Sequence, residues 1–171
     1  MNKTFLAVAI ALLSMGFTSN AQNHYSVQIG MQATEMSKYL LTQNDVEFSK
    51  YVIPEIMEKM GGREKFLQIM ADLHKEFTEG GMIIKSVDIG QPGAIIDTAN
   101  TLQCIVPEIT VMTSSQGNIK QTSSLLAFST DKGNTWKFVD YIEENAEQLR
   151  TIIPTISCRH KPPPRETVPM K

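Results

Sequence analysis

Cysteine is scarce in this chain of 171 residues, which contains only Cys104 and Cys158. Neither cysteine has a histidine or second cysteine at the spacing of a metal motif, so the sequence predicts no metal, no cofactor and no catalytic thiol. Two cysteines allow one intramolecular disulfide in an oxidising compartment, so a Cys104–Cys158 bridge is one prediction. The alternative is two free thiols, because Cys104 lies in an apolar strand pattern and behaves there as a small hydrophobic residue.

An excess of positive charge is also missing. The chain has 16 lysines and arginines against 18 aspartates and glutamates, which gives a net charge of −2. The basic residues are scattered among carboxylates instead of forming the patch or stripe that nucleic-acid binding requires. The sequence therefore predicts no nucleic-acid partner.

No apolar run is long enough to span a bilayer. The run from Phe5 to Leu13 follows Lys3 and precedes small residues and a candidate cleavage site after Ala21. This pattern is typical of a secretory signal peptide over residues 1–21, whereas a membrane span needs about 20 apolar residues. The mature chain would keep 15 basic and 18 acidic residues, a net charge of −3, and would be periplasmic or secreted with no membrane span.

The first half of the chain has the periodicity of helices. Apolar residues at helical spacing predict helices over residues 27–41 and 63–79, and Pro54 opens a short one between them. Asn44 or Asp45 can cap the segment that precedes Pro54. The paired glycines after residues 60 and 79 are interpreted as helix caps and not as a phosphate loop.

From Met82 the period changes to that of strands. Five strands are predicted, at residues 82–89, 94–96, 101–113, 118–130 and 135–142. In the third strand the apolar positions change from even to odd numbers after Pro107, which predicts a β-bulge or bend there. A short helix near residues 146–153 and a mobile Pro-rich tail over 158–171 complete the chain. The fold class is therefore α+β, in which a single domain over residues 22–157 packs its N-terminal helices on a curved antiparallel meander.

The stretch STDKGNTW, residues 129–136, matches the Asp-box turn that repeats around sialidase-type propellers. A propeller needs several sheet blades, and this chain has about five strands and one such motif. We therefore interpret the stretch as a structural turn between two strands. Its defining residues are Ser129, Asp131, Gly133, Thr135 and Trp136.

The order of elements resembles that of the nuclear-transport-factor-2-like family, also called the SnoaL-like or cystatin-like α+β superfamily. The supporting stretches are LLTQNDVEFSKYVIPEIMEKMGG (residues 40–62), SVDIGQPG (86–93) and GNTWKFVD (133–140). The chain is similar to a secreted bacterial member. The resemblance implies a cone-shaped sheet around the long helices, an apolar pocket at its open end, and either enzymatic or binding function.

A cone-fold enzyme would need a buried carboxylate or histidine as general base, with a tyrosine or a second acid as hydrogen-bond donor. The weak candidates for such a role are Asp88, Asp140, His74 and Tyr51. Glu108 follows Pro107, and we expect its side chain to face solvent. The chain lacks Gly-x-Ser-x-Gly, His-Glu-x-x-His and phosphate-loop motifs, so no catalytic constellation is identified.

Two smaller signals concern the surface. Asp97-Thr98-Ala99 resembles an O-glycosylation acceptor of some secreted bacterial proteins, which makes Thr98 a candidate site. Residues 82–84 with Trp136 and Phe138 would form an apolar sheet face for a homodimer, although packing against the helices is the default.

These observations favour a secreted or periplasmic binding or accessory module. Its partner would be a small apolar ligand, a peptide or a second copy of the chain. The alternative is a small-molecule isomerase or hydrolase that uses Asp88 or Asp140 together with a tyrosine.

Overall fold

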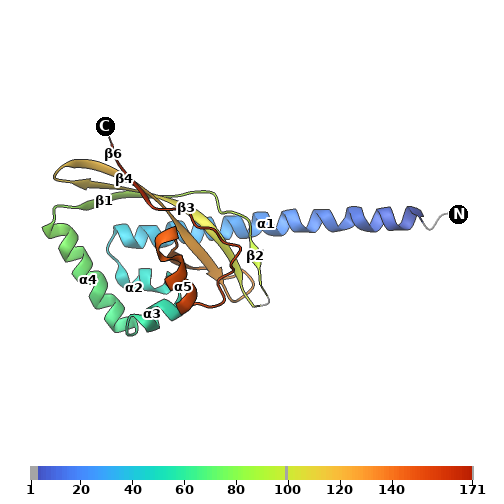
Figure 1. Cartoon of the computed structure of the whole chain (residues 1–171), viewed down its shortest axis with the longest axis horizontal. Coiled ribbons are helices and arrows are strands. Elements are labelled where there is room, and N and C mark those ends of the chain that lie inside the picture. The colour runs from blue at the N-terminus through green and yellow to red at the C-terminus, as the bar shows by residue number, and fades with distance from the viewer. Residues whose placement is uncertain (1–3, 99, 171) are drawn as a thin grey trace.

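The computed structural model describes residues 4–98 and 100–170, and it describes side chains from Gln22 onward except at Asn23. Within these residues the chain forms five α-helices and six strands, so the α+β class is confirmed. Helix α1 lies against the concave face of an open, curved antiparallel sheet, and its N-terminal half extends beyond the body of the molecule (Figure 1). No helix in the described part of the chain is both long and apolar enough to cross a membrane.

The helices come first in the chain. They are α1 (Thr4–Leu41), α2 (Asp45–Phe48), the 3-10 helix η1 (Ser49–Tyr51), α3 (Pro54–Lys59) and α4 (Arg63–Glu79). Asn44 caps α2 by accepting a hydrogen bond from the backbone N–H of Glu47 at 3.3 Å. The predicted apolar stripe of α4 is buried only near its start, at Phe66 and Met70, whereas Leu73 is 37% exposed. The last turns of α4 therefore extend past the core.

The strands follow in the order of a meander with two additions. They are β1 (Ile83–Ile89), β2 (Ile96–Asp97), β3 (Leu102–Ser114), β4 (Gly117–Ser129), β5 (Lys137–Asp140) and β6 (Glu166–Pro169), and the main sheet order is β1-β3-β4-β5. The short β2 pairs with β3, and β6 pairs with β4. All strand pairs are antiparallel.

The predicted bulge at Pro107 is wrong. β3 pairs with β4 without a register shift from Leu102 to Ser114, so the even-numbered residues of β3 stay on one face of the sheet. Thr110 is buried at a position where an apolar residue was expected. The pattern of apolar residues alone therefore suggested a one-residue shift in register that the strand does not have. The irregularity lies in β1 instead, between Ile84 and Ser86.

Both faces of the sheet are packed, each against a different helix. On the concave face, Ile29, Ala33 and Met36 of α1 contact the inner residues of β3 and β4. On the opposite face, Leu126 and Phe128 of β4 pack against α5 (Ala146–Ile152) and the segment after it. Trp136 and Phe138 are 1% and 2% exposed, so they belong to the concave-face core and do not form the predicted dimer surface.

The turn at residues 129–136 is held by its own side chains. The Ser129 hydroxyl accepts the Gly133 N–H at 2.9 Å, and Asp131 accepts both the N–H and the hydroxyl of Thr135, at 2.9 and 2.7 Å. Gly133 has φ of +87°, and a Cβ added there would lie 2.4 Å from the Tyr25 ring. The Trp136 indole N–H closes the turn on the Gly133 carbonyl at 3.1 Å.

The C-terminal segment is not the mobile tail that the sequence predicted, because it is packed and paired with the rest of the molecule. Glu166–Pro169 forms β6 on the edge of β4, His160 is 4% exposed, and the Glu143 N–H donates to the Pro163 carbonyl at 3.0 Å. The consecutive prolines hold the chain in an extended conformation as it returns along the molecule. Proline has no backbone N–H to donate, so pairing with β4 begins only after the prolines, in β6.

The predicted Cys104–Cys158 disulfide is also wrong, because both cysteines are free. Cys104 is fully buried on the α1 side of β3, while Cys158 is exposed in the segment that covers the other face. Burial raises the pKa of the Cys104 thiol to about 12, so the thiol stays protonated and inert.

Gln103 attaches the C-terminal segment to the sheet. Its side chain is fully buried, donates to the Thr155 carbonyl at 2.7 Å and accepts the Ser157 N–H at 3.0 Å. We expect Gln103→Leu to lower the free energy of unfolding by about 2 kcal/mol, because it leaves two backbone groups without partners. Urea unfolding measures this loss, and Gln116→Leu in the exposed β3–β4 turn, expected within about 0.5 kcal/mol of wild type, is the control. Equal stability of the two variants would contradict the assignment.

Candidate functional site

A small cavity lies between α1, α2 and the concave face of the sheet. Its volume is about 180 Å³, well below the several hundred Å³ of most ligand pockets. Most of its wall is apolar and comes from Met36, Leu40, Phe48, Leu125, Phe138 and Val139. Three polar residues complete it, namely Ser37, Glu108 and Asp140. The geometry suits a ligand of about one ring with few polar groups.

Glu108 is the principal polar group of the cavity. It lies on the concave face of β3 between Val106 and Thr110, in register with Ser123, whose hydroxyl is 3.4 Å from its Oε1. Burial, and next the charge of Asp140, raise the pKa of Glu108 to about 7, although the Ser123 hydroxyl works in the opposite direction. The expectation that this side chain faces solvent is therefore wrong.

The Glu108 position follows from the register of β3. Leu102, Cys104 and Val106 share its face, and without a bulge at Pro107 that face continues through residue 108. The even-number alternation that precedes Pro107 was the signal that could have identified Glu108.

Asp140 lies at the rim of the same cavity. Its Oδ2 accepts the Arg165 guanidinium at 2.6 Å, and the Asn145 amide donates to its backbone carbonyl at 2.8 Å. The side chains of Asp140 and Arg165 are each 38% exposed. The sequence singled out Asp140 as a buried acid, but the side chain is a partly exposed acid with a cationic partner. Sequence reasoning missed Arg165, because it lies in the segment that was expected to be mobile.

The other sequence candidates lie outside the cavity. Asp88 is exposed and pairs in register with Ile109, which places it on the face of the sheet opposite α1. Its assignment as a desolvated base is therefore wrong. The His74 Nε2 lies 2.8 Å from Asp45 Oδ1, so this half-buried pair joins α4 to α2.

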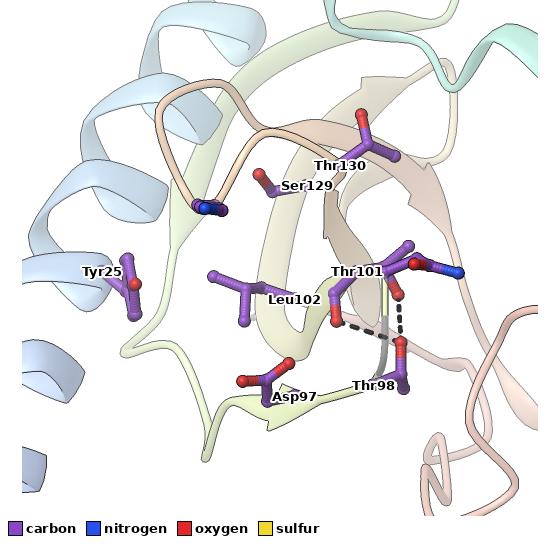
Figure 2. Close-up of a pocket in the computed structure, with 9 residues that line it drawn as sticks. Tyr25, Asp97, Thr98, Thr101, Leu102, Ser129 and Thr130 are labelled. Carbon is purple, nitrogen blue, oxygen red and sulfur yellow. Dashed lines mark hydrogen bonds between the residues drawn. The ribbon is translucent and has the colours of Figure 1, made fainter.

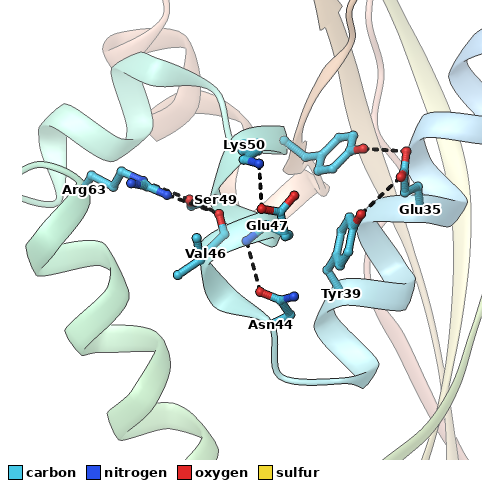
Figure 3. Close-up of polar contacts among 9 residues, drawn as sticks. Glu35, Tyr39, Asn44, Val46, Glu47, Ser49, Lys50 and Arg63 are labelled. Carbon is cyan, nitrogen blue, oxygen red and sulfur yellow. Dashed lines mark hydrogen bonds and ion pairs between the residues drawn. The ribbon is translucent and has the colours of Figure 1, made fainter.

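Tyr51 contacts a different acid. Its hydroxyl donates to Glu35 at 2.6 Å, and the Tyr39 hydroxyl donates to the same carboxylate at 3.2 Å (Figure 3). The two phenols, Tyr51 first, lower the pKa of Glu35. Burial and this hydrogen bond raise the pKa of Tyr51, so its hydroxyl is a donor at neutral pH. Glu35 is exposed, so the cluster stabilises the junction of α1 and η1 on the surface.

Further polar contacts fix the segment that brings Phe48 to the cavity. Arg63 donates to the Ser49 hydroxyl at 3.2 Å and to the Val46 carbonyl at 3.3 Å, and Lys50 pairs with Glu47 at 2.6 Å (Figure 3). These contacts link α4 to α2 and η1. The wall of the cavity that α2 provides is therefore held by a neighbouring helix.

A second, more polar hollow of about 500 Å³ lies where the STDKGNTW turn approaches α1 and the start of β3 (Figure 2). Tyr25 and Lys132 line it together with hydroxyl-bearing residues. The Thr98 hydroxyl lies at its edge, 3.1 Å from the Thr101 carbonyl and 2.7 Å from the Thr101 hydroxyl. O-glycosylation at Thr98 stays a prediction, and it would remove the hydrogen bond that this hydroxyl donates to the Thr101 carbonyl.

Over residues 4–98 and 100–170, no three His, Cys, Asp or Glu side chains come together in a way that would hold a metal ion. Neither the protein-family models nor the curated protein sequences compared with the chain give a match. Among solved structures, a protein from Catenulispora acidiphila is similar at a TM-score of 0.45 and 13% identity, over 71% of this chain and 88% of that chain. A likeness this low adds nothing about function, so the cavity must be interpreted on its own chemistry.

Proposed function

We propose that the protein is a small binding module whose concave-face cavity holds one small, largely apolar ligand. The observation that carries this proposal is a cavity of about 180 Å³ with apolar walls on four elements and a buried carboxyl, Glu108, at its inner face. An apolar wall with a few placed polar groups is typical of small-molecule sites. We also propose that the chain is a nuclear-transport-factor-2-like cone protein and that its signal peptide directs export. Both proposals are compatible with a binding function.

The competing function is that of a small-molecule isomerase or hydrolase. Glu108 supports it, because a carboxyl with a pKa near 7 is suited to general acid or base work. Asp140 lines the cavity as a second acid. Among the residues that the structure describes, no tyrosine or histidine lines it. We favour binding because neither a tyrosine nor a histidine accompanies Glu108 in this wall, and Asp140 is ion-paired with Arg165.

Titration with single-ring neutral probes tests the binding function. We expect toluene and benzyl alcohol to shift the amide NMR signals of cavity residues in the wild-type protein, and Ser37→Leu to abolish the shifts. Ser37 is 3% exposed and lines the cavity, so a larger side chain there fills it. Thr34→Leu, on the exposed side of α1, is the matched control and should bind as wild type does.

Two results would overturn the proposal. One is wild-type protein that binds neither probe, and the other is Ser37→Leu protein that binds both unchanged. Turnover of an ester or epoxide probe, lost on Glu108→Gln, would favour the enzymatic alternative instead.

A further inference from the structure

Two of the three polar residues that line the concave-face cavity are carboxylic acids. Glu108 and Asp140 bring acceptor oxygens to it, whereas the hydroxyl of Ser37 donates to the Ala33 carbonyl at 2.9 Å. When ionised, the two carboxyl groups offer only acceptor oxygens to a ligand, and the Ser37 hydroxyl, the third polar group of the lining, is already in use. A ligand that pairs with the ionised form of Glu108 therefore donates hydrogen bonds.

The charges around Glu108 point to the same conclusion. Asp140 comes from β5, and Arg165, the cation beside it, is bound to Asp140 at 2.6 Å. Helices α1 and α2 contribute only uncharged side chains to the lining, and the hydroxyls of Ser123 and Thr110 are neutral. Glu108 is therefore a buried acid beside a second acid, and Arg165, the cation whose charge acts on it, already has a partner.

We infer that the ligand is a primary amine with a compact apolar body, whose ammonium group binds Glu108 inside the concave-face cavity. This inference rests on the proposed binding function. An ammonium group supplies both the hydrogen-bond donors and the positive charge that the wall lacks. The rings of Phe48 and Phe138 also line the cavity, and aromatic faces attract cations.

The size of the cavity restricts the apolar body. An apolar cavity of about 150 Å³ holds benzene, so about 180 Å³ suits one ring with a short aminomethyl arm. Benzylamine is therefore a suitable probe, and benzyl alcohol and toluene are its neutral counterparts of nearly the same shape.

Binding of an ammonium group also moves a proton. Near pH 6 the Glu108 carboxyl is mostly protonated, because burial holds its pKa at about 7. The protonated carboxyl and the ammonium ion form a carboxylate–ammonium pair, and the carboxyl proton passes to the buffer. The ligand stays protonated throughout, so amine binding should release close to one proton, while a neutral probe should release none.

Isothermal titration calorimetry at pH 6 in two buffers of different ionisation enthalpy tests the inference on the full mature chain. We expect benzylamine to bind wild type at least tenfold more tightly than benzyl alcohol, with release of nearly one proton. Glu108→Gln should lower the affinity for benzylamine at least tenfold and leave that for benzyl alcohol within twofold, which also shows that the cavity is intact. Glu147→Gln, an exposed acid on α5, is the control and should behave as wild type.

The outcomes separate the two proposals. Binding of neutral probes without preference for benzylamine, or benzylamine binding that survives Glu108→Gln, would overturn the amine assignment and leave the binding function in place. Absence of binding by all three probes would overturn both.

Discussion

Replacing Trp136 with alanine is expected to lower the free energy of unfolding by about 3–5 kcal/mol, as large-to-small substitutions of buried aromatic residues do. Trp136 is 1% exposed, packs edge-on against Tyr25 at 6.2 Å between ring centroids, and donates its indole N–H to the Gly133 carbonyl. Alanine would leave a cavity and an unpaired carbonyl together. For a chain of this length we expect the melting temperature to fall by about 6–20 °C.

Circular dichroism is the suitable measurement, because Trp136 is the only tryptophan and its fluorescence is lost with it. Trp136→Phe keeps an aromatic ring and removes the indole donor, so it should cost less than the alanine variant. A loss of under about 1 kcal/mol for Trp136→Ala would show that the turn at residues 129–136 does not anchor the last hairpin to α1.

The second large effect concerns pH and Glu108. The pKa of Glu108 is about 7 in the folded protein and near its ordinary value of 4.5 in the unfolded chain, so the folded state binds the proton more tightly. The contribution of Glu108 to stability is then fully present below pH 4.5 and is lost as the pH rises through 7. At about 1.4 kcal/mol per pKa unit, the loss approaches about 3 kcal/mol. Glu108→Gln should therefore be more stable than wild type at pH 8 by up to about 3 kcal/mol.

The comparison must be made between variants, because another group titrates in the opposite sense. Burial, and next the charges of Arg159 and Arg150, lower the pKa of His160 to about 4 in the folded protein. That group costs stability as the pH falls below its ordinary value, which opposes the Glu108 effect in wild type. Urea unfolding of wild type and Glu108→Gln from pH 5 to 8 isolates Glu108, since both proteins keep His160. Asp88→Asn should follow the wild-type profile. A stability difference that does not change with pH would contradict the burial of Glu108.

Local patterns were sufficient for most of the fold. The helix at 63–79 has the predicted bounds, and the long strands fall close to those expected, because hydrophobic period and Gly or Pro punctuation act within a few residues. Asn44 and Pro54 act as the sequence indicated, one as a cap and the other as a helix start. These features depend only on neighbours in the chain.

The site was harder to predict because it depends on contacts between distant residues. Glu108 and Asp140 share the cavity only because β3, β4 and β5 align in one register, and Thr110 hid that register by placing a hydroxyl where an apolar residue was expected. Arg165 reaches Asp140 because β6 pairs with β4, a pairing for which the Pro-rich sequence gave no signal. Long-range pairing of this kind leaves little trace in any single stretch of sequence.

The place of β6 also has a consequence for the order of folding. Strands β4 and β5 join across the short turn at residues 129–136, whereas Pro169 must find Ile119, a separation of 169 − 119 = 50 residues. The entropy lost on closing a loop grows with its length, so β6 should dock after the hairpins have formed. The chain would pass through a state in which the hairpins are complete and Asp140 still lacks Arg165. In that transient state the rim of the cavity is more negative, because the Asp140 carboxylate has no cationic partner.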